Sequence, residues 1–183
     1  NEPPLAEDMR FNYIRIYEDV VKHVGNKNWY VGGGIAFDHH FAINDQKLNT
    51  DTSSDDFFIT NHYAYSKKYG FDEQSYSTNG INFNVLTDNR DHIANPYKGY
   101  YASLTLRYNP KIGRSSQQSF MALYDFRYYL NLSKVCPRHL IAIWSYGTFV
   151  MDGNVPYLAL PSIGWDTYNR SGRGYIQGRY RGL

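Results

Sequence analysis

Two short groups of residues are of types that commonly bind phosphate or metal ions. The glycines at 32–34 are a flexible run of the kind that can cradle a phosphate, but no Lys-Ser or Lys-Thr pair follows them. They also lie in a strand-like segment, where glycine more often allows a bend or close packing. His39 and His40, with Asp38 and Asp45 nearby, are potential metal ligands, but adjacent residues of a strand point to opposite faces. We therefore expect neither a phosphate site nor a metal site here.

Residues for nucleophilic catalysis can also be found, but without the sequence context that would activate them. Ser171, His92 and Asp91 supply the three residue types of a hydrolase triad, yet no serine lies in a G-x-S-x-G sequence. Cys136 is the only cysteine, so it forms no internal disulfide and sites built on several cysteines are excluded. We expect a chain that is not an enzyme and binds no cofactor.

Aromatic residues are unusually frequent in a chain that is polar on average. The 183 residues include 19 Tyr, 10 Phe and 3 Trp, and 19 basic side chains nearly balance 17 acidic ones. This balance argues against a nucleic-acid partner. No apolar run approaches the ~20 residues that a membrane-spanning helix needs. Membrane strands expose apolar residues on one face only, so a polar average is compatible with a membrane barrel.

Apolar and polar residues alternate with a period of two, which predicts β-strands. Phe120, Tyr124 and Leu130 share one face of such a segment, whereas Asp125 and Arg127 fall on the other. Most of these segments reach the ~9 to 11 residues of a membrane strand. The predicted strands are residues 9–23, 29–43, 78–91, 99–110, 118–131, 138–151 and 176–183.

The connections between these segments alternate strictly between short and long. In chain order they are residues 25–28, 44–77, 92–98, 109–117, 132–137 and 152–176. Outer-membrane barrels have this arrangement of short periplasmic turns and longer external loops. We expect the longest connection to be an external, functional or mobile segment. The predicted fold is all-β, an antiparallel up-and-down transmembrane β-barrel segment. A soluble β-barrel that binds a ligand, with its apolar face inward, is the alternative.

Two motifs lie at ends of the predicted strands. In the first, Asp88, Arg90 and Asp91 are followed by Pro96 and Gly99, an arrangement of charged residues and turn formers that reverses the chain. It resembles the D-x-R-D…P-x-x-G hairpin of the bacterial surface antigen domain, the barrel of the BamA/TamA outer-membrane-assembly superfamily.

The second motif is similar to the Arg-Gly-aromatic loop of that superfamily and to the strand that follows the loop. The matching loop residues are Arg173, Gly174 and Tyr175, and the matching strand residues are Gly178, Arg179, Tyr180 and Arg181. The resemblance implies that the loop folds back into the barrel lumen, where polar groups hold its arginine. A buried guanidinium is costly unless paired, so Arg173 should meet a carboxylate or an aromatic face.

The resemblance also implies a place in a larger barrel. It spans about residues 9 to 183 and makes these strands the middle ones of a sixteen-stranded barrel. Open sheet edges are not tolerated in hydrocarbon, because unsatisfied backbone groups cost several kcal/mol each. Residues 1–183 are therefore expected to be a single barrel segment that is incomplete at both ends.

The resemblance further implies a function at the outer membrane of a Gram-negative bacterium. The parent protein would help insert or translocate proteins by pairing a client strand with an exposed barrel edge, without covalent chemistry. Its implied partners are membrane lipid, unfolded outer-membrane client proteins and accessory lipoproteins. An alternative is a barrel that anchors or exports a fused enzymatic domain, such as a phosphoesterase or a patatin-like lipase.

Overall fold

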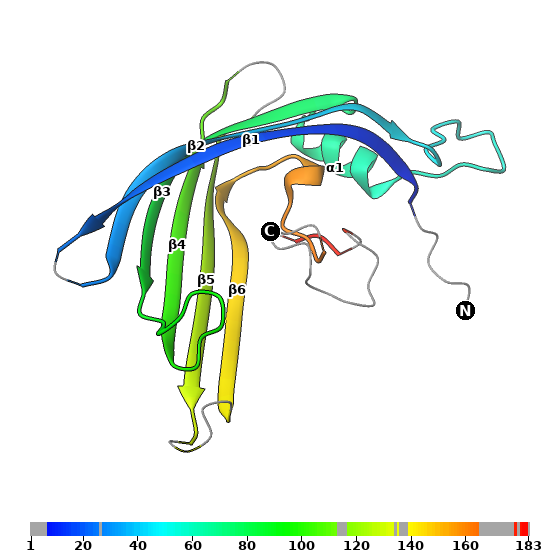
Figure 1. The fold of residues 1–183 in the computed structure, drawn as a ribbon. Helices are drawn as coiled ribbons and strands as arrows, with labels where there is room; N and C mark the ends of the chain where they lie inside the picture. Colours follow the sequence, from blue (N-terminus) through cyan, green and yellow to red (C-terminus); the bar gives the residue numbers. More distant parts are fainter. Residues whose placement is uncertain are drawn as a thin grey trace.

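Six antiparallel strands form one open sheet in the order β1-β2-β3-β4-β5-β6, each paired with its neighbours along the chain (Figure 1). This up-and-down arrangement confirms the predicted fold class. The computed structural model describes residues 7–25, 27–112, 117–133, 135, 139–164, 178 and 180–182. The strands are β1 (Met9–Val24), β2 (Trp29–Asp45), β3 (Ser75–Asp88), β4 (Gly99–Asn109), β5 (Ser119–Asn131) and β6 (Leu140–Gly153).

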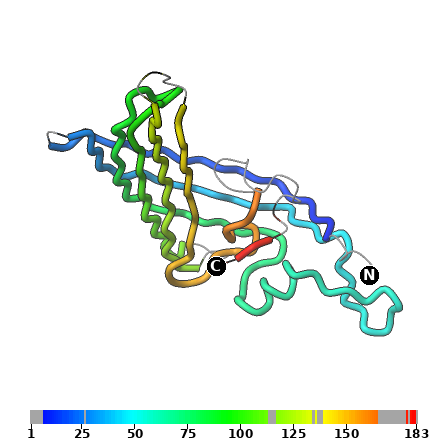
Figure 2. The backbone as a smooth tube through the Cα atoms, turned by 90° about the horizontal axis from the view of Figure 1, so that it is seen from below, coloured from blue at the N-terminus to red at the C-terminus, as the bar shows by residue number. Residues whose placement is uncertain are grey.

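The sheet curves like a segment of a barrel wall. β1 and β2 arch across the more upright strands β4 to β6, and the concave side holds two short helices, α1 (Asn61–Tyr69) and η1 (Tyr157–Ala159) (Figures 1 and 2). Residues 160–164 and 180–182, which follow η1, lie on the same side. No helix in the described residues is long and apolar enough to cross a membrane.

The two faces of the sheet differ sharply in chemistry. The convex face carries large apolar side chains that no other part of the described chain covers, including Ile35 and Ile81, which are 64% and 62% exposed. Such a continuous apolar surface is unfavourable in water and marks a surface that contacts another apolar phase. Its other members include Ile14, Ile16, Phe37, Phe83, Leu104, Phe126, Leu130, Ile141, Ile143 and Phe149.

The concave face carries the charged and polar residues of the same strands. Strand register places Arg15 of β1 beside Asp38 of β2, and Asp38 beside Thr78 of β3. On β5, Asp125 and Arg127 alternate with the apolar residues of the convex face. This polarity is the reverse of that of a soluble barrel, whose apolar side chains would point inward.

The predicted strand limits agree with the first six strands to within three residues at each end. β3 shows the largest difference, since it ends at Asp88 and not at residue 91. The carboxylate of Asp91 accepts hydrogen bonds from the backbone N–H groups of Tyr97 (3.0 Å) and Lys98 (3.3 Å). These bonds close a turn, so the chain has already left the sheet at Asp91.

A seventh strand at 176–183 is not formed by the residues described there. Arg181 makes an isolated bridge with Ser162, and the N–H of Gly178 donates to the carbonyl of Ile163 (2.8 Å). The N–H of Gly182 donates to the carbonyl of Pro161 (3.0 Å). These residues therefore pair with the segment that follows β6 and add no strand to the sheet.

The connection between β2 and β3, expected to be one long loop, contains α1. Thr60 caps its N-terminus by accepting the N–H of Tyr63, and Gly70 ends it in the left-handed conformation. Lys67 and Lys68 lie in the last turn, where positive charge is favourable. The segment is thus a structured element, and its helix contributes buried residues to the concave side.

Candidate functional site on the concave face

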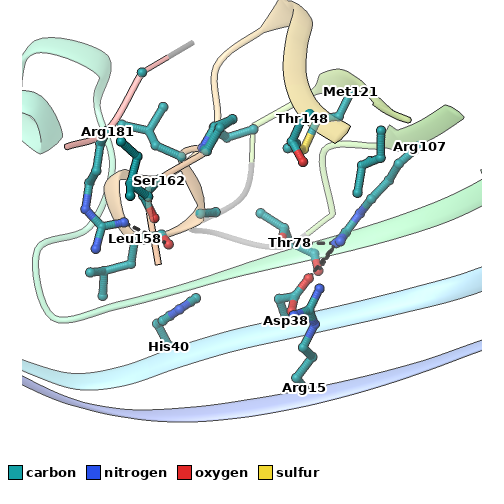
Figure 3. A pocket seen from close by; sticks show the side chains of 18 of the residues that line it. Arg15, Asp38, His40, Thr78, Arg107, Met121, Thr148, Leu158, Ser162 and Arg181 are labelled. Atoms are coloured by element: carbon teal, nitrogen blue, oxygen red, sulfur yellow. Dashed lines mark hydrogen bonds and ion pairs between the residues drawn. The ribbon is translucent and has the colours of Figure 1, made fainter. Parts of the chain in front are cut away.

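Asp38 is the centre of an ion-pair network that joins three strands. Its carboxylate is 2.8 Å from the Arg107 guanidinium of β4 and 3.3 Å from that of Arg15 on β1, and it accepts a 2.5 Å hydrogen bond from the Tyr13 hydroxyl. Asp38 is buried, with 6% of its surface exposed. Figure 3 shows Arg15 and Arg107 converging on Asp38 from opposite sides. The network ties β1, β2 and β4 together across the curved wall.

Arg107 can reach Asp38 because the strand between them has no side chain at the crossing point. Gly80 of β3 lies under the Arg107 side chain, and a Cβ built on it would collide with the Arg107 Nε and the Asn109 Oδ1. Arg107 also donates to Asn109 (2.7 Å) and to the Thr78 hydroxyl (3.3 Å). The arrangement satisfies the guanidinium with one charged and several neutral acceptors, as a buried arginine requires.

Gly34 of β2 plays the same role for Asp19. The Asp19 side chain of β1 passes over Gly34 and reaches β3. The Asp19 carboxylate accepts hydrogen bonds from the side-chain amides of Asn82 (3.0 Å) and Asn84 (2.8 Å). A Cβ on Gly34 would collide with Asp19 Oδ1 and with the Glu18 carbonyl. The glycine run therefore serves close packing of polar side chains, as expected of glycines within a strand.

The segment after β6 folds into the concavity and packs against the sheet. Val155, Leu158 and Leu160 are buried, Leu158 against Tyr76 of β3 and the other two against Met121 of β5. The N–H of Leu158 donates to the Tyr76 hydroxyl (3.1 Å). We call residues 154–163 the inserted segment.

Helix α1 holds the inserted segment from its other side. The Tyr65 hydroxyl donates to the carbonyl of Val155 (3.0 Å). Burial raises the pKa of Tyr65 to about 12, so the hydroxyl remains protonated and able to donate at neutral pH. The inserted segment is thus hydrogen-bonded both to the wall and to the helix.

Arg181 is a partly buried cation that contacts the inserted segment without a carboxylate partner among the described residues. It donates to the carbonyls of Tyr157 and Leu158, both at 3.3 Å, and its guanidinium lies 5.0 Å from the centre of the Tyr157 ring. Burial lowers the pKa of Arg181, because the charged form is poorly solvated there. An arginine nonetheless stays protonated in proteins.

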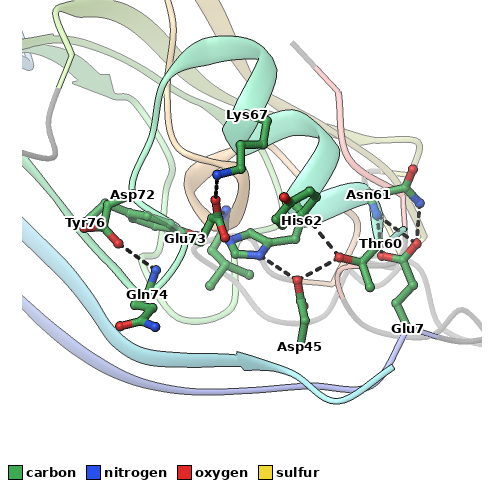
Figure 4. A network of polar contacts seen from close by, with 12 residues as sticks. Glu7, Asp45, Thr60, Asn61, His62, Lys67, Asp72, Glu73, Gln74 and Tyr76 are labelled. Carbon is green, nitrogen blue, oxygen red and sulfur yellow. Dashed lines mark hydrogen bonds and ion pairs between the residues drawn. The ribbon is translucent and has the colours of Figure 1, made fainter. Parts of the chain in front are cut away.

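A buried polar cluster fixes α1 to the end of β2. Asp45 lies 2.9 Å from His62 Nδ1 and accepts a hydrogen bond from the Thr60 hydroxyl (2.7 Å) (Figure 4). Glu7 accepts hydrogen bonds from the backbone and side chain of Asn61 at the start of the helix. The side chains of His62 and Asp45 are only 1% and 5% exposed. Together these contacts dock α1 at the same end of the sheet as the inserted segment.

The first motif forms the turn between β3 and β4. Arg90 makes a two-pronged contact with Asp88 through Nε (2.9 Å) and Nη2 (2.6 Å), and this hydrogen bonding raises the pKa of Arg90. Asp91 organises the middle of the turn, where Pro96 lies, as described above. Gly99 begins β4 with φ of +103°. The structure therefore gathers all five motif residues in one turn.

The second motif is described only in part. Arg173, Gly174, Tyr175 and Arg179 lie outside the described residues, so the lumen loop and the partner of Arg173 stay predictions. Gly178, Tyr180 and Arg181 lie beside the inserted segment on the concave side. Of these, Arg181 enters the interior and Tyr180 is 50% exposed.

The two adjacent histidines point to opposite faces, as the strand geometry predicts. His39 Nδ1 is hydrogen-bonded to Ser77 (2.8 Å), and its ring stacks on Phe41. His40 lies on the concave face, where its ring stacks on Tyr13 with centroids 4.4 Å apart. Within the described residues, no three His, Cys, Asp or Glu side chains are grouped to hold a metal ion.

Sequence reasoning missed the residues that carry the network. Asp38 was considered only as a possible metal ligand, and Arg107 was assigned no role. Their pairing depends on the register of three strands and on the glycines between them, which periodicity alone does not determine. The alternation that turns both side chains inward was the one signal available.

A curved antiparallel sheet with an apolar convex face, a charged concave face and a segment packed inside defines the wall of an up-and-down membrane β-barrel. A family model of the Omp85 superfamily domain matches residues 10–175, so the chain belongs to the Omp85 superfamily. The resemblance to the BamA/TamA superfamily is thereby confirmed. Searches of curated proteins and of solved structures found no match. Omp85 proteins are outer-membrane proteins that act in protein insertion and translocation.

Proposed function

We propose that the protein containing this chain resides in the bacterial outer membrane and takes part in inserting or translocating other proteins there. The observation that carries the proposal is the apolar convex face of a wall that belongs to the Omp85 superfamily. Lipid accepts such a face, and the charged concave face suits a water-filled lumen. The turns β1-β2, β3-β4 and β5-β6 then face the periplasm, and α1 and the inserted segment lie at the external end.

The proposed activity is non-covalent. Client strands would gain backbone hydrogen bonds by pairing with a barrel edge, which is β-augmentation. Unfolded outer-membrane proteins, accessory lipoproteins and membrane lipid are the proposed partners. The network around Asp38 supports this role, because a wall that guides other chains must keep its own curvature.

Client folding in liposomes tests the proposal. The purified protein, reconstituted in liposomes, should speed membrane insertion of a urea-denatured porin at least severalfold over empty liposomes, as followed by the heat-stable gel mobility of the folded porin. Arg173→Ala should reduce both this acceleration and the resistance of the barrel to heat. Arg10→Ala, at an exposed position of β1, is the control and should behave as the wild type.

Equal porin insertion with and without the protein would contradict the assembly role. It would favour the alternative of a barrel that anchors or exports a fused enzymatic domain. Unchanged activity and heat resistance in Arg173→Ala would remove that arginine from the functional residues.

A further inference from the structure

A cavity of about 630 Å³ lies between the concave face and the inserted segment (Figure 3). Its size is within the ~300–1,000 Å³ of sites that bind small molecules. One wall comes from β1 to β6, and the other from the inserted segment and Tyr180 to Gly182. The cavity is therefore built by parts of the chain that are distant in sequence.

Positive charge predominates in the lining of this cavity. Arg15, Arg107 and Arg181 line it, and Asp38 is the only carboxylate among the described residues that do so. Asp38 is shared between Arg15 and Arg107. Arg181 donates to the backbone carbonyls of Tyr157 and Leu158, whose partial charges do not neutralise a partly buried guanidinium. Among the described residues, no carboxylate lines the end of the cavity near Arg181.

Two further polar groups of the lining have unmet hydrogen-bonding capacity. Nε2 of His40 and the hydroxyl of Ser162 are buried and have no hydrogen-bond partner within the described part of the chain. His40 is 3% exposed. A buried polar atom without a partner is costly, and such atoms commonly mark the place of a ligand or water. In Figure 3, Arg181, Ser162 and His40 lie around the same end of the cavity.

Most of the remaining lining on the side of Met121 is apolar. Met121 and Leu123 of β5 face Val155, Leu160 and other residues of the inserted segment. An ion as small as inorganic phosphate would leave these side chains without contact. The cavity thus offers a cationic end with spare donors next to an apolar compartment.

We propose that this cavity binds an amphipathic anion, a molecule with a phosphate or carboxylate group on a small apolar body. Arg181 and the Ser162 hydroxyl donate to the anionic group, and the Met121 side of the cavity contacts the apolar body. The anion could belong to a free organic acid or to a lipid headgroup, which share this chemistry. The proposal does not depend on the protein-insertion activity.

Titration of the protein in nanodiscs of zwitterionic lipid tests the site, with phenyl phosphate, inorganic phosphate and phenol as probes and calorimetry as the readout. Phenyl phosphate should bind at least tenfold more tightly than either of the other two probes. Arg181→Gln should weaken its binding by at least about tenfold, since it removes a charge-assisted contact. Ser162→Ala, which breaks no side-chain hydrogen bond between described residues, should weaken binding about threefold. Arg10→Gln should leave binding unchanged.

Adding anionic phosphatidylglycerol to the nanodiscs shows whether the bound anion is a lipid headgroup or a free organic acid. A fall in the apparent affinity for phenyl phosphate means that the lipid headgroup occupies the cavity, and an unchanged affinity means that free anions are its ligands. Equal binding of phenol and phenyl phosphate would overturn the proposal, as would wild-type affinity in both Arg181→Gln and Ser162→Ala.

Discussion

Replacing Asp38 with alanine is expected to lower the free energy of unfolding by about 3–5 kcal/mol, the usual effect of removing one partner from a buried ion pair. Arg107, whose side chain is only 12% exposed, would lose the Asp38 carboxylate at 2.8 Å, its one carboxylate partner among the described residues. The Tyr13 hydroxyl would lose its 2.5 Å hydrogen bond to Asp38 as well. Equilibrium unfolding in urea, with the protein in lipid bilayers, measures this change.

Asp8→Ala provides the matched control. Asp8 also pairs with a basic residue, Lys47, but at 4.0 Å and with 67% of its side chain exposed. Exposed pairs contribute about 0–1 kcal/mol, so this variant should unfold almost as the wild type does. Equal destabilisation in Asp38→Ala and Asp8→Ala would show that the concave network does not hold the wall together.

Replacing Gly34 with alanine is expected to be nearly as damaging, although it adds a single methyl group. The new Cβ would collide with the Glu18 carbonyl, which is backbone, and with the Asp19 carboxylate. Overpacking costs about 1–3 kcal/mol, and displacing Asp19 from Asn82 and Asn84 adds the loss of hydrogen bonds to a charged group. We expect a total loss of at least about 3 kcal/mol in the same unfolding experiment.

Gly33→Ala is the control in the neighbouring position. A Cβ there would lie 3.1 Å from the nearest atom, the Asn82 carbonyl, and needs only a small adjustment. Its expected cost is about 1 kcal/mol or less. In an Asp19→Ala background, Gly34→Ala should lower the free energy of unfolding by less, because the collision of the new Cβ with the Asp19 carboxylate is removed. If Gly33→Ala and Gly34→Ala had similar free energies of unfolding, the Asp19 side chain would not pass over Gly34 to reach β3.

Much of the fold follows from the sequence because a strand has a fixed side-chain period. The alternation of Phe120, Tyr124 and Leu130 with Asp125 and Arg127 was enough to predict β5 and its two faces. The ends of the strands were predicted less accurately, because they depend on individual hydrogen bonds such as those of Asp91. Helix α1 had readable signals in Thr60 and Gly70, but a nine-residue helix with weak amphipathicity has no clear periodic pattern.

The concave network could not be predicted, because it depends on register and curvature. Asp38 and Arg107 are 69 positions apart in the sequence and are separated in space by β3. Only the paired register of β2, β3 and β4, with Gly80 between them, brings the two side chains together. For the same reason Arg181 was assigned to a strand, whereas it turns inward beside the inserted segment.

The direction in which the apolar face points is the claim on which the proposed function depends. It can be measured with single nitroxide labels on β4 of the reconstituted protein, in a Cys136→Ser background. Leu104 is on the convex face, and its neighbours Ser103 and Thr105 are on the concave face. We predict that a label at 104 collides mainly with oxygen, which concentrates in lipid, and that labels at 103 and 105 collide mainly with a water-soluble nickel chelate. A label at 104 that meets the nickel chelate as readily as its neighbours do would contradict a lipid-facing convex surface.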